Sequence, residues 1–180
     1  MSAESSLDRR QEKTRQAITS VFMAMLFDQP YGAITVAAIA ERANVGRSTF
    51  YEHFRTKSDV LSHCVAAPFS VLAGAVNAPE PAPALIFILQ HFRENHSLGR
   101  VLLAMPTRTI LMRVLAAEVE KCLPATAFPA PLLASQIAAA QMALVEPWSL
   151  GQIAASADKI AQALCRTSHA MAQAMTASDD

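Results

Sequence analysis

Residues 34–57 read ITVAAIAERANVGRSTFYEHFRTK, the pattern of two short helices joined by a tight turn. Thr35 can cap the first helix, expected over about 36–43, because its hydroxyl can accept a hydrogen bond from a first-turn N–H. Asn44 lies where the chain must reverse, and asparagine tolerates a positive φ better than most non-glycine residues. A second helix is expected over about 47–53. The stretch therefore predicts a helix-turn-helix motif at 34–53.

The second helix has two chemically different sides. Phe50 and Phe54 are four residues apart and define an inner face. Arginine can bind guanine O6 and N7 through two hydrogen bonds, and hydroxyl and imidazole groups bond to phosphate oxygens. A lysine that opens the next helix can share a phosphate with the free N–H groups there. The predicted DNA contacts are Thr35, Arg47, Ser48, Thr49, Tyr51, His53 and Lys57. From the spacing alone, a helical hairpin with a polar outer face remains an equal alternative.

The individual residues of this stretch distinguish the two interpretations. Thr35, Ala40, Val45, the block Thr49-Phe50-Tyr51-Glu52-His53-Phe54 and Lys57 together resemble the DNA-binding domain of the TetR family of transcriptional regulators. The resemblance is strong over about 11–61 and beyond that concerns only the helical plan. Gly46 stands where the family often has a serine cap, and Ser48 stands where Gly, Ala or Pro is usual. The resemblance implies a homodimer that binds double-stranded DNA and responds to a small-molecule effector.

Composition and net charge say less about the function than the helix-turn-helix motif does. The chain has 180 residues, 52% of them apolar, which is enough to bury a sizeable core. Its 15 basic and 15 acidic residues cancel, so net charge does not argue for nucleic-acid binding. Residues 1–60 hold eight basic and seven acidic side chains. A basic DNA-binding surface must therefore arise from the placement of charges and not from their excess.

The sequence points to a cytoplasmic protein. Its three cysteines are far apart and form no metal-binding pattern, so we expect free thiols in a reducing compartment, with redox sensing as the minor alternative. The N-terminus is polar and does not resemble a signal peptide. No apolar run is expected to reach the roughly 18 residues of a membrane helix.

Taken in order, the chain predicts an all-α fold of about nine helices. The DNA-binding domain is expected over 8–60 and an effector-binding and dimerisation domain over 61–176, with disordered tails at 1–7 and 177–180. The first helix should end near Asp28. Its four N-terminal cations are interpreted as a solvated helix end, with a minor-groove arm as the alternative: Arg9, Arg10, Lys13 and Arg15. Further helices are expected over about 57–76, 84–95, 106–123, 132–150 and from 156, with a turn at 98–104.

The last two helices carry many apolar side chains, more than a monomer of this size needs. We therefore expect them to meet their copies in a symmetric four-helix interface, with internal packing as the competing explanation. The predicted interface residues are Leu133, Ile137, Leu144, Trp148, Ile160, Leu164 and Met171. The resemblance also implies an effector pocket in the C-terminal helices. Its predicted lining is Phe69, Leu72, Phe87, Phe92, Met105, Leu111, Met112 and Met142.

The sequence offers little for catalysis. His91 and His96 do not share a helix face, and no glycine-rich phosphate loop, paired carboxylates or nucleophile motif is present. We therefore predict no enzyme, no cofactor and no metal site. The predicted function is a ligand-responsive regulator, a repressor rather than an activator, that is released from a palindromic operator by a small apolar effector. The alternative is a helical ligand-binding or interaction protein without regulatory DNA binding.

Overall fold

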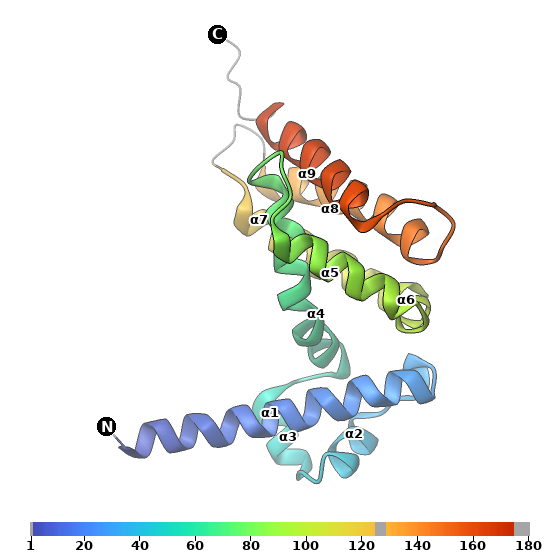
Figure 1. Cartoon of the computed structure of the whole chain (residues 1–180). Coiled ribbons are helices and arrows are strands. Elements are labelled where there is room, and N and C mark those ends of the chain that lie inside the picture. Colours follow the sequence, from blue (N-terminus) through green and yellow to red (C-terminus); the bar gives the residue numbers. More distant parts are fainter. Residues whose placement is uncertain (1, 125–128, 175–180) are drawn as a thin grey trace. The chain divides into compact units, whose positions relative to one another are not determined.

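The computed structural model describes residues 2–124 and 129–174 and divides the chain into two compact units, Met1–Cys64 and Val65–Asp180. The division falls close to the domain boundary predicted after residue 60. Within the described residues there are nine α-helices and two short 3-10 helices, and no strand (Figure 1). The predicted all-α class is confirmed.

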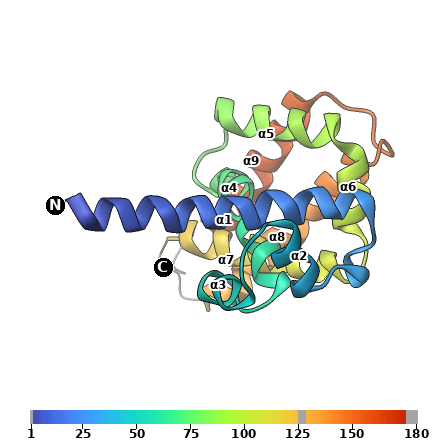
Figure 2. The same cartoon turned by 90° about the horizontal axis from the view of Figure 1, so that it is seen from below.

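The first unit is a small helical domain. Its elements are α1 (Ser2–Asp28), the 3-10 helix η1 (Tyr31–Ala33), α2 (Val36–Arg42), α3 (Arg47–His53) and the start of α4 (Lys57–Ala73). Helix α1 packs on α2, and α2 packs on α3 (Figure 2). Four side chains at its centre have no solvent exposure: Ile18, Phe22, Ile39 and Phe50. This core fixes the orientation of α3.

The start of α1 differs from the prediction. Residues 2–7 were expected to be a disordered tail, but α1 is helical from Ser2. Extending an existing helix costs far less than nucleating one, and this segment contains no glycine or proline to stop it. The predicted tail at 177–180 lies outside the described residues.

The turn between α2 and α3 has the predicted local chemistry. Thr35 is the N-cap of α2, and its Oγ1 accepts a hydrogen bond from the backbone N–H of Ala38 at 3.1 Å. Asn44 has φ = 53° and is the only non-glycine residue with positive φ among the described residues. Gly46 is the N-cap of α3 and provides no side-chain hydrogen bond there. The predicted bounds of α2 and α3 agree with the structure to within one residue.

Helix α4 belongs to both units and continues into the 3-10 helix η2 (Gly74–Val76). Pro68 lies inside it as predicted, so the carbonyl of Cys64 lacks its usual N–H partner four residues later. By length and mean hydropathy (1.5), Lys57–Val76 could cross a membrane, although it contains no continuous apolar run of the expected length. Alanines and other small residues raise its hydropathy without forming one continuous apolar run. Because 44% of this segment is buried inside the fold, we interpret it as a core helix.

The second unit contains the remaining helices. They are α5 (Pro83–Glu94), α6 (His96–Leu103), α7 (Thr107–Cys122), α8 (Ala130–Ser149) and α9 (Ala157–Ala174). Helices α7 and α8 pack extensively on each other, and α9 packs against α8, α5 and η2. Gly151 has φ = 78° and follows α8, the role predicted for it.

Two predictions about this unit were wrong. The segment expected as a turn at 98–104 lies largely within α6, because packing against α7 and α8 outweighs the low helix propensity of Gly99. Pro106 was expected at the first helical position of α7. It precedes the helix as its N-cap and follows a cis peptide bond from Met105.

The residues predicted to form a dimer interface serve a different purpose. Five of them are almost completely buried within this single chain: Leu133, Ile137, Trp148, Ile160 and Leu164. Leu144 and Met171 are half-buried. The apolar stripes of α8 and α9 therefore pack against their own unit, which was the competing explanation. Periodicity identified the buried faces correctly but not their partners.

A polar side chain lies within the core of the second unit. Gln141 on α8 donates through Nε2 to the carbonyl of Leu72 (3.3 Å) and to Oγ of Ser168 (3.0 Å). Its Oε1 is buried without a hydrogen-bond partner. Nearby, Nδ1 of His169 donates to the carbonyl of Val76 at 2.9 Å. These bonds hold the end of α4 and η2 against α8 and α9.

Candidate nucleic-acid interface

The exposed face of α3 carries the side chains that the sequence selected for DNA contact. Arg47, Ser48 and Tyr51 are all exposed, and Tyr51 retains 56% of its accessible surface. Phe50, on the same helix, has no exposure and packs against Phe54 at 6.1 Å between ring centroids. The buried side thus holds α3 in place, while the other side offers a guanidinium, a hydroxyl and a phenol to a partner.

The other predicted contacts lie at the edges of this face or next to it. Thr49 and His53 on α3 are half-buried. Thr35 is exposed, but its hydroxyl already accepts the α2 capping bond. These three side chains are therefore less available to a partner than those of Arg47, Ser48 and Tyr51.

One residue of the exposed face was missed from the sequence. Glu52 is exposed and lies four residues after Ser48, just as Tyr51 lies four residues after Arg47. Residues four apart share a helix face, so the two pairs form one surface. A carboxylate there can accept a hydrogen bond from cytosine N4. The i, i+4 spacing from Ser48 would have identified it.

Lys57 is the first residue of α4, as predicted, and its ammonium group contacts the backbone of the same unit. Its Nζ donates to the carbonyls of Tyr31 and Ile34, both at 2.7 Å, and to that of Gly32 at 3.4 Å. It also lies over the Tyr31 ring, 4.4 Å from the centroid. Burial lowers the pKa of its ammonium group. The side chain predicted to reach a phosphate thus donates to backbone carbonyls of its own unit.

A capping box precedes and enters the first turn of α4. Asp59 Oδ2 accepts from the backbone N–H groups of Arg55 (3.2 Å) and Thr56 (2.9 Å), and Thr56 Oγ1 accepts from the N–H of Asp59 (3.2 Å). This is a reciprocal capping box, and Thr56-x-x-Asp59 is its sequence signature. The box uses the N–H groups of Arg55 and Thr56, which precede α4. The predicted phosphate contact of Lys57 stays a prediction.

Three of the four cations at the start of α1, Arg9, Arg10 and Lys13, are exposed. Lys13 precedes Ile18 by five residues and Arg9 precedes it by nine, which places them about 140° and 180° around the helix from that buried side chain. Arg15 pairs with Glu12 at 3.3 Å. This arrangement agrees with the interpretation of a solvated helix end.

The residues predicted to line an effector pocket do not form one site. Four are buried in the core: Phe69, Leu72, Leu111 and Met142. Phe87 and Met105 are 66% and 72% exposed, and Phe92 is half-buried. Only Met112 lines the open groove of about 450 Å³ found between α7 and α8.

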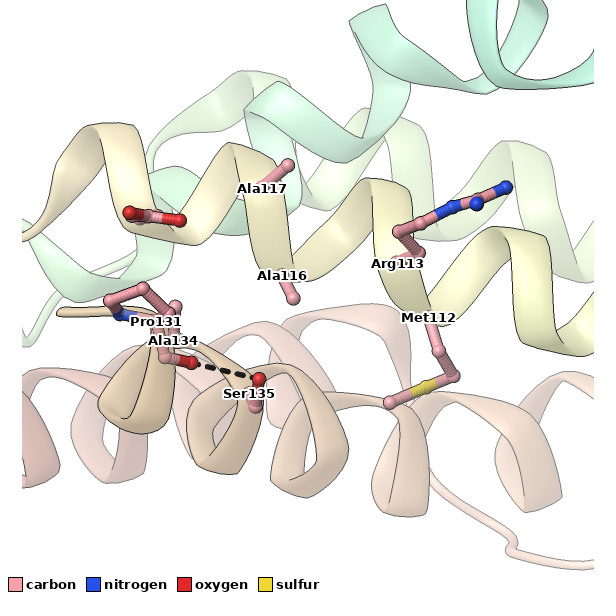
Figure 3. A pocket seen from close by; sticks show the side chains of 8 residues that line it. Met112, Arg113, Ala116, Ala117, Pro131, Ala134 and Ser135 are labelled. Atoms are coloured by element: carbon pink, nitrogen blue, oxygen red, sulfur yellow. Dashed lines mark hydrogen bonds between the residues drawn. The ribbon is translucent and has the colours of Figure 1, made fainter. Parts of the chain in front are cut away.

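That groove has a small-residue floor and a charged rim (Figure 3). Met112 and Ala116 of α7 face α8, which contributes Pro131, Ala134 and Ser135. Ser135 Oγ donates to the carbonyl of Pro131 at 2.8 Å, and Arg113 extends away from α8 (Figure 3). Ala117 and Glu120 complete the lining. Helical periodicity cannot predict such a groove, because its shape depends on the size of side chains on two helices.

The three thiols are poorly suited to redox sensing. Burial raises the pKa of Cys64 to about 11. Burial also raises the pKa of Cys122 and of Cys165, with nearby Glu118 and Glu80 adding to it respectively. The thiolate is the reactive form, so a raised pKa lowers reactivity. Within residues 2–124 and 129–174, no group of three His, Cys, Asp or Glu side chains could hold a metal ion.

Comparison with known proteins places the first unit in a family. Residues 18–64 match the family model described as bacterial regulatory proteins, tetR family. A relative from Bacillus subtilis (strain 168), the uncharacterized HTH-type transcriptional regulator YxbF, is 37% identical over 59 residues. This match covers 32% of the present chain and only 16% of the relative's length. The family match thus includes the whole helix-turn-helix.

Solved structures share the arrangement of helices. A TetR transcriptional regulator from Streptococcus agalactiae 2603V superimposes with a TM-score of 0.58 at 23% identity, covering 92% of this chain and 98% of that one. The TetR-family regulator SCO0857 from Streptomyces coelicolor A3 gives 0.65 at 17%, covering 90% and 96%. The dihydroxyacetone kinase operon activator DhaS gives 0.52 at 18%, covering 91% and 98%. At these identities the likeness concerns the fold.

The family match and the fold agree with each other. The matched segment contains the complete helix-turn-helix with its exposed α3 face, and the TetR fold extends over at least 90% of the chain. Residues 18–64 therefore match the tetR family of bacterial regulatory proteins, and the chain as a whole shares the fold of solved TetR-family regulators.

Proposed function

We propose that this protein is a cytoplasmic DNA-binding transcriptional regulator, and not an enzyme, in which α3 reads an operator. The observation that carries the proposal is the division of α3 into a fully buried face at Phe50 and an exposed face with Arg47, Ser48 and Tyr51. A rigidly held helix with exposed hydrogen-bonding side chains is the element that enters a major groove. The match to a family of regulatory proteins over residues 18–64 supports the same role.

Each side chain has a proposed task at the operator. Arg47 binds guanine O6 and N7, and Glu52 accepts from cytosine N4. Ser48, Tyr51 and His53 bond to phosphate oxygens and so set the register of the helix on the duplex. Thr35 and Thr49 line the edge of this contact. Base specificity then depends on Arg47 and Glu52, and orientation depends on the hydroxyl and imidazole groups.

The proposed assembly is a homodimer formed through the exposed face of α8. This surface, which we call the α8 outer face, contains no charged residue and consists of Leu132, Ser135, Gln136, Ala139, Ala140 and Ala143. Leu132 is 55% exposed. Small uncharged side chains let helices approach closely, and a two-fold axis through such a face makes it self-complementary. Two α3 helices would then read half-sites about 34–36 Å apart or a multiple of that.

The proposed regulation is release of a repressor by a small, largely apolar effector. A ligand can shift an equilibrium only by its different affinity for two conformations. The groove between α7 and α8 supports such a site, because its floor is made of Met112, Ala116 and Ala134 and its rim includes Arg113. Helix α4 extends from the effector-binding unit into the DNA-binding unit and is the element through which the two would be coupled.

Selection of bound duplexes from a random pool tests the DNA-binding proposal. The expected result is a palindromic motif with two half-sites. A helical ligand-binding or interaction protein would recover no motif, which would overturn the proposal. Placing the recovered operator between a promoter and a reporter then separates the sign of regulation: a repressor lowers expression, whereas an activator raises it.

A further inference from the structure

We propose that α4 and η2 together form a hinged element. Its C-terminal part, residues 72–76, is fixed to α8 and α9 by Gln141 and His169, and it bends within residues 62–68, where Pro68 interrupts the helical hydrogen bonds. We call these two stretches the clamped end and the bending segment. The consequence of this hinge for DNA recognition rests on the proposed function.

The clamped end is held by polar groups of two other helices. The carbonyls of Leu72 and Val76 are four residues apart, one in the last turn of α4 and one at the end of η2. Gln141 Nε2 on α8 donates to the first at 3.3 Å, and His169 Nδ1 on α9 donates to the second at 2.9 Å. The last carbonyls of a helix have no partner within it, so these two side chains cap the element from outside.

The Gln141 amide can hold α4 in only one orientation. A backbone carbonyl can only accept a hydrogen bond, so the amide must present its nitrogen to Leu72. The same nitrogen also donates to Ser168 Oγ at 3.0 Å. The side chain is 1% exposed, and its Oε1 is buried without a hydrogen-bond partner among the described residues. A displacement of the clamped end along α8 would therefore break a buried hydrogen bond that the flipped amide could not replace.

Apolar packing fixes the clamped end as well. The 3-10 helix η2 packs closely on α9 and also contacts α7. Leu72, Ala73, Ala75 and Val76 are at most 4% exposed. The clamped end is thus a rigid part of the second unit.

The bending segment has neither kind of support. Between Leu61 and Phe69 the only buried residue is Val65. Pro68 has no N–H, so the carbonyl of Cys64 lacks its helical partner. The division of the chain into two compact units falls directly after Cys64. Sharp bends of helices occur at such interruptions, and few packing contacts oppose a bend at this one.

A helix that is fixed at one end and weakened in its middle transmits movement in a defined way. A shift of α8 or α9 would carry the clamped end with it, because hydrogen bonds join the clamped end to both helices. The bending segment then determines how much of that shift reaches residues 57–61, which belong to the DNA-binding unit. A stiffer bending segment should restrict the two α3 helices of the proposed dimer to one half-site spacing.

Hydrogen exchange followed by mass spectrometry tests the hinge on the full-length protein without DNA. Exchange reports local opening, so each part of α4 can be measured separately. We expect faster exchange at 61–67 than at 72–76. Pro68→Ala supplies the missing N–H and should slow exchange at 61–67 about tenfold, the scale of one hydrogen bond, with 72–76 unchanged. Ser70→Ala, at an exposed position of the same helix, is the control and should change neither stretch.

Gln141→Met should give the complementary pattern. It removes the donor to Leu72 and keeps a side chain of similar size, so exchange at 72–76 should rise about tenfold while exchange at 61–67 stays the same. His169→Leu should act in the same direction and serves as the second variant if Gln141→Met folds poorly. Gln162→Met, at an exposed position of α9, is the control. Circular dichroism establishes that each variant is folded.

The functional consequence is measured with the duplex recovered in the selection and with derivatives that have one base pair inserted or removed between the half-sites. Such a change alters both the separation and the relative angle of the half-sites. Pro68→Ala should bind the original duplex as tightly as the wild type. On the derivatives it should lose about tenfold more affinity than the wild type loses, the scale of one mismatched base pair.

Each outcome has a distinct meaning. Exchange that changes equally along the whole of α4 in Pro68→Ala or Gln141→Met would indicate one rigid helix and overturn the inference. Unchanged exchange at 61–67 in folded Pro68→Ala would exclude the hinge, and unchanged exchange at 72–76 in folded Gln141→Met and His169→Leu would exclude the clamp. An equal loss by Pro68→Ala and the wild type on the derivatives would overturn the role of the hinge in DNA recognition. Failure of the wild type to recover any duplex would contradict the proposed function, while the exchange measurements would still decide whether the hinge exists.

Discussion

At the scale of single residues, the angular position of a side chain on α3 decides its function. Phe50 and Tyr51 are neighbours in sequence, yet one has no exposure and the other retains 56% of its surface. Their rings meet edge to face, with centroids 5.7 Å apart, so the buried ring supports the exposed one. A helix of only seven residues can be held rigidly in this way because one of its faces is committed to the core.

Arg47 provides the sharpest test at this scale. Replacing Arg47 with Ala should reduce operator affinity by about 1–3 kcal/mol and relax the preference at one base pair, because a bidentate contact to guanine is lost. A repeated selection with the variant measures both effects. Lys13→Ala, which removes an exposed cation on the far side of α1, is the control and should leave the motif intact. An equal loss on all sequences would mean that Arg47 contacts phosphate only.

At the scale of elements, α8 combines two faces with different partners. Ile137 and Trp148 are buried in its own unit, whereas the α8 outer face is exposed and uncharged. The single charged residue of α8, Glu146, is paired with Arg108 at 3.1 Å and does not belong to the α8 outer face.

Placing a charge on the α8 outer face should dissociate the proposed dimer. Ala139→Arg would bring two cations together near the two-fold axis and bury them without partners, a large cost. Analytical ultracentrifugation should show a dimer for the wild type and a monomer for the variant. Ala24→Arg, the same substitution at an exposed position of α1, should remain dimeric. A wild-type monomer, or a dimeric Ala139→Arg variant, would place the interface elsewhere or exclude it.

The individual helices also show which parts of the structure could be predicted from the sequence. Thr35, Asn44 and Phe50 act on their immediate neighbours, so the bounds of α2 and α3 followed from local chemistry. Helix α6 could not be predicted this way, since its formation depends on packing against α7 and α8. The backbone contacts of Lys57 were also hidden, because its partners at 31–34 lie more than 20 residues away.

At the scale of the whole molecule, burial of thiols links stability to pH. The pKa of Cys64 rises in the folded state from an ordinary 9.0 to about 11, so folding favours the protonated thiol. This contribution is fully present below pH 9 and is lost as pH rises through about 11. We expect the free energy of unfolding, measured by urea titration, to decline over this interval. Cys64→Ala should show a shallower decline, and an unchanged pH profile in that variant would contradict the assignment.

The equal numbers of basic and acidic residues affect the solubility of the protein. With an isoelectric point near 7.0, copies of this chain do not repel one another through net charge at neutral pH. An uncharged helix surface that is exposed to water under those conditions favours nonspecific association between molecules. Dimerisation would cover these surfaces and keep the protein in solution. Solubility in the cell would then depend on dimer formation.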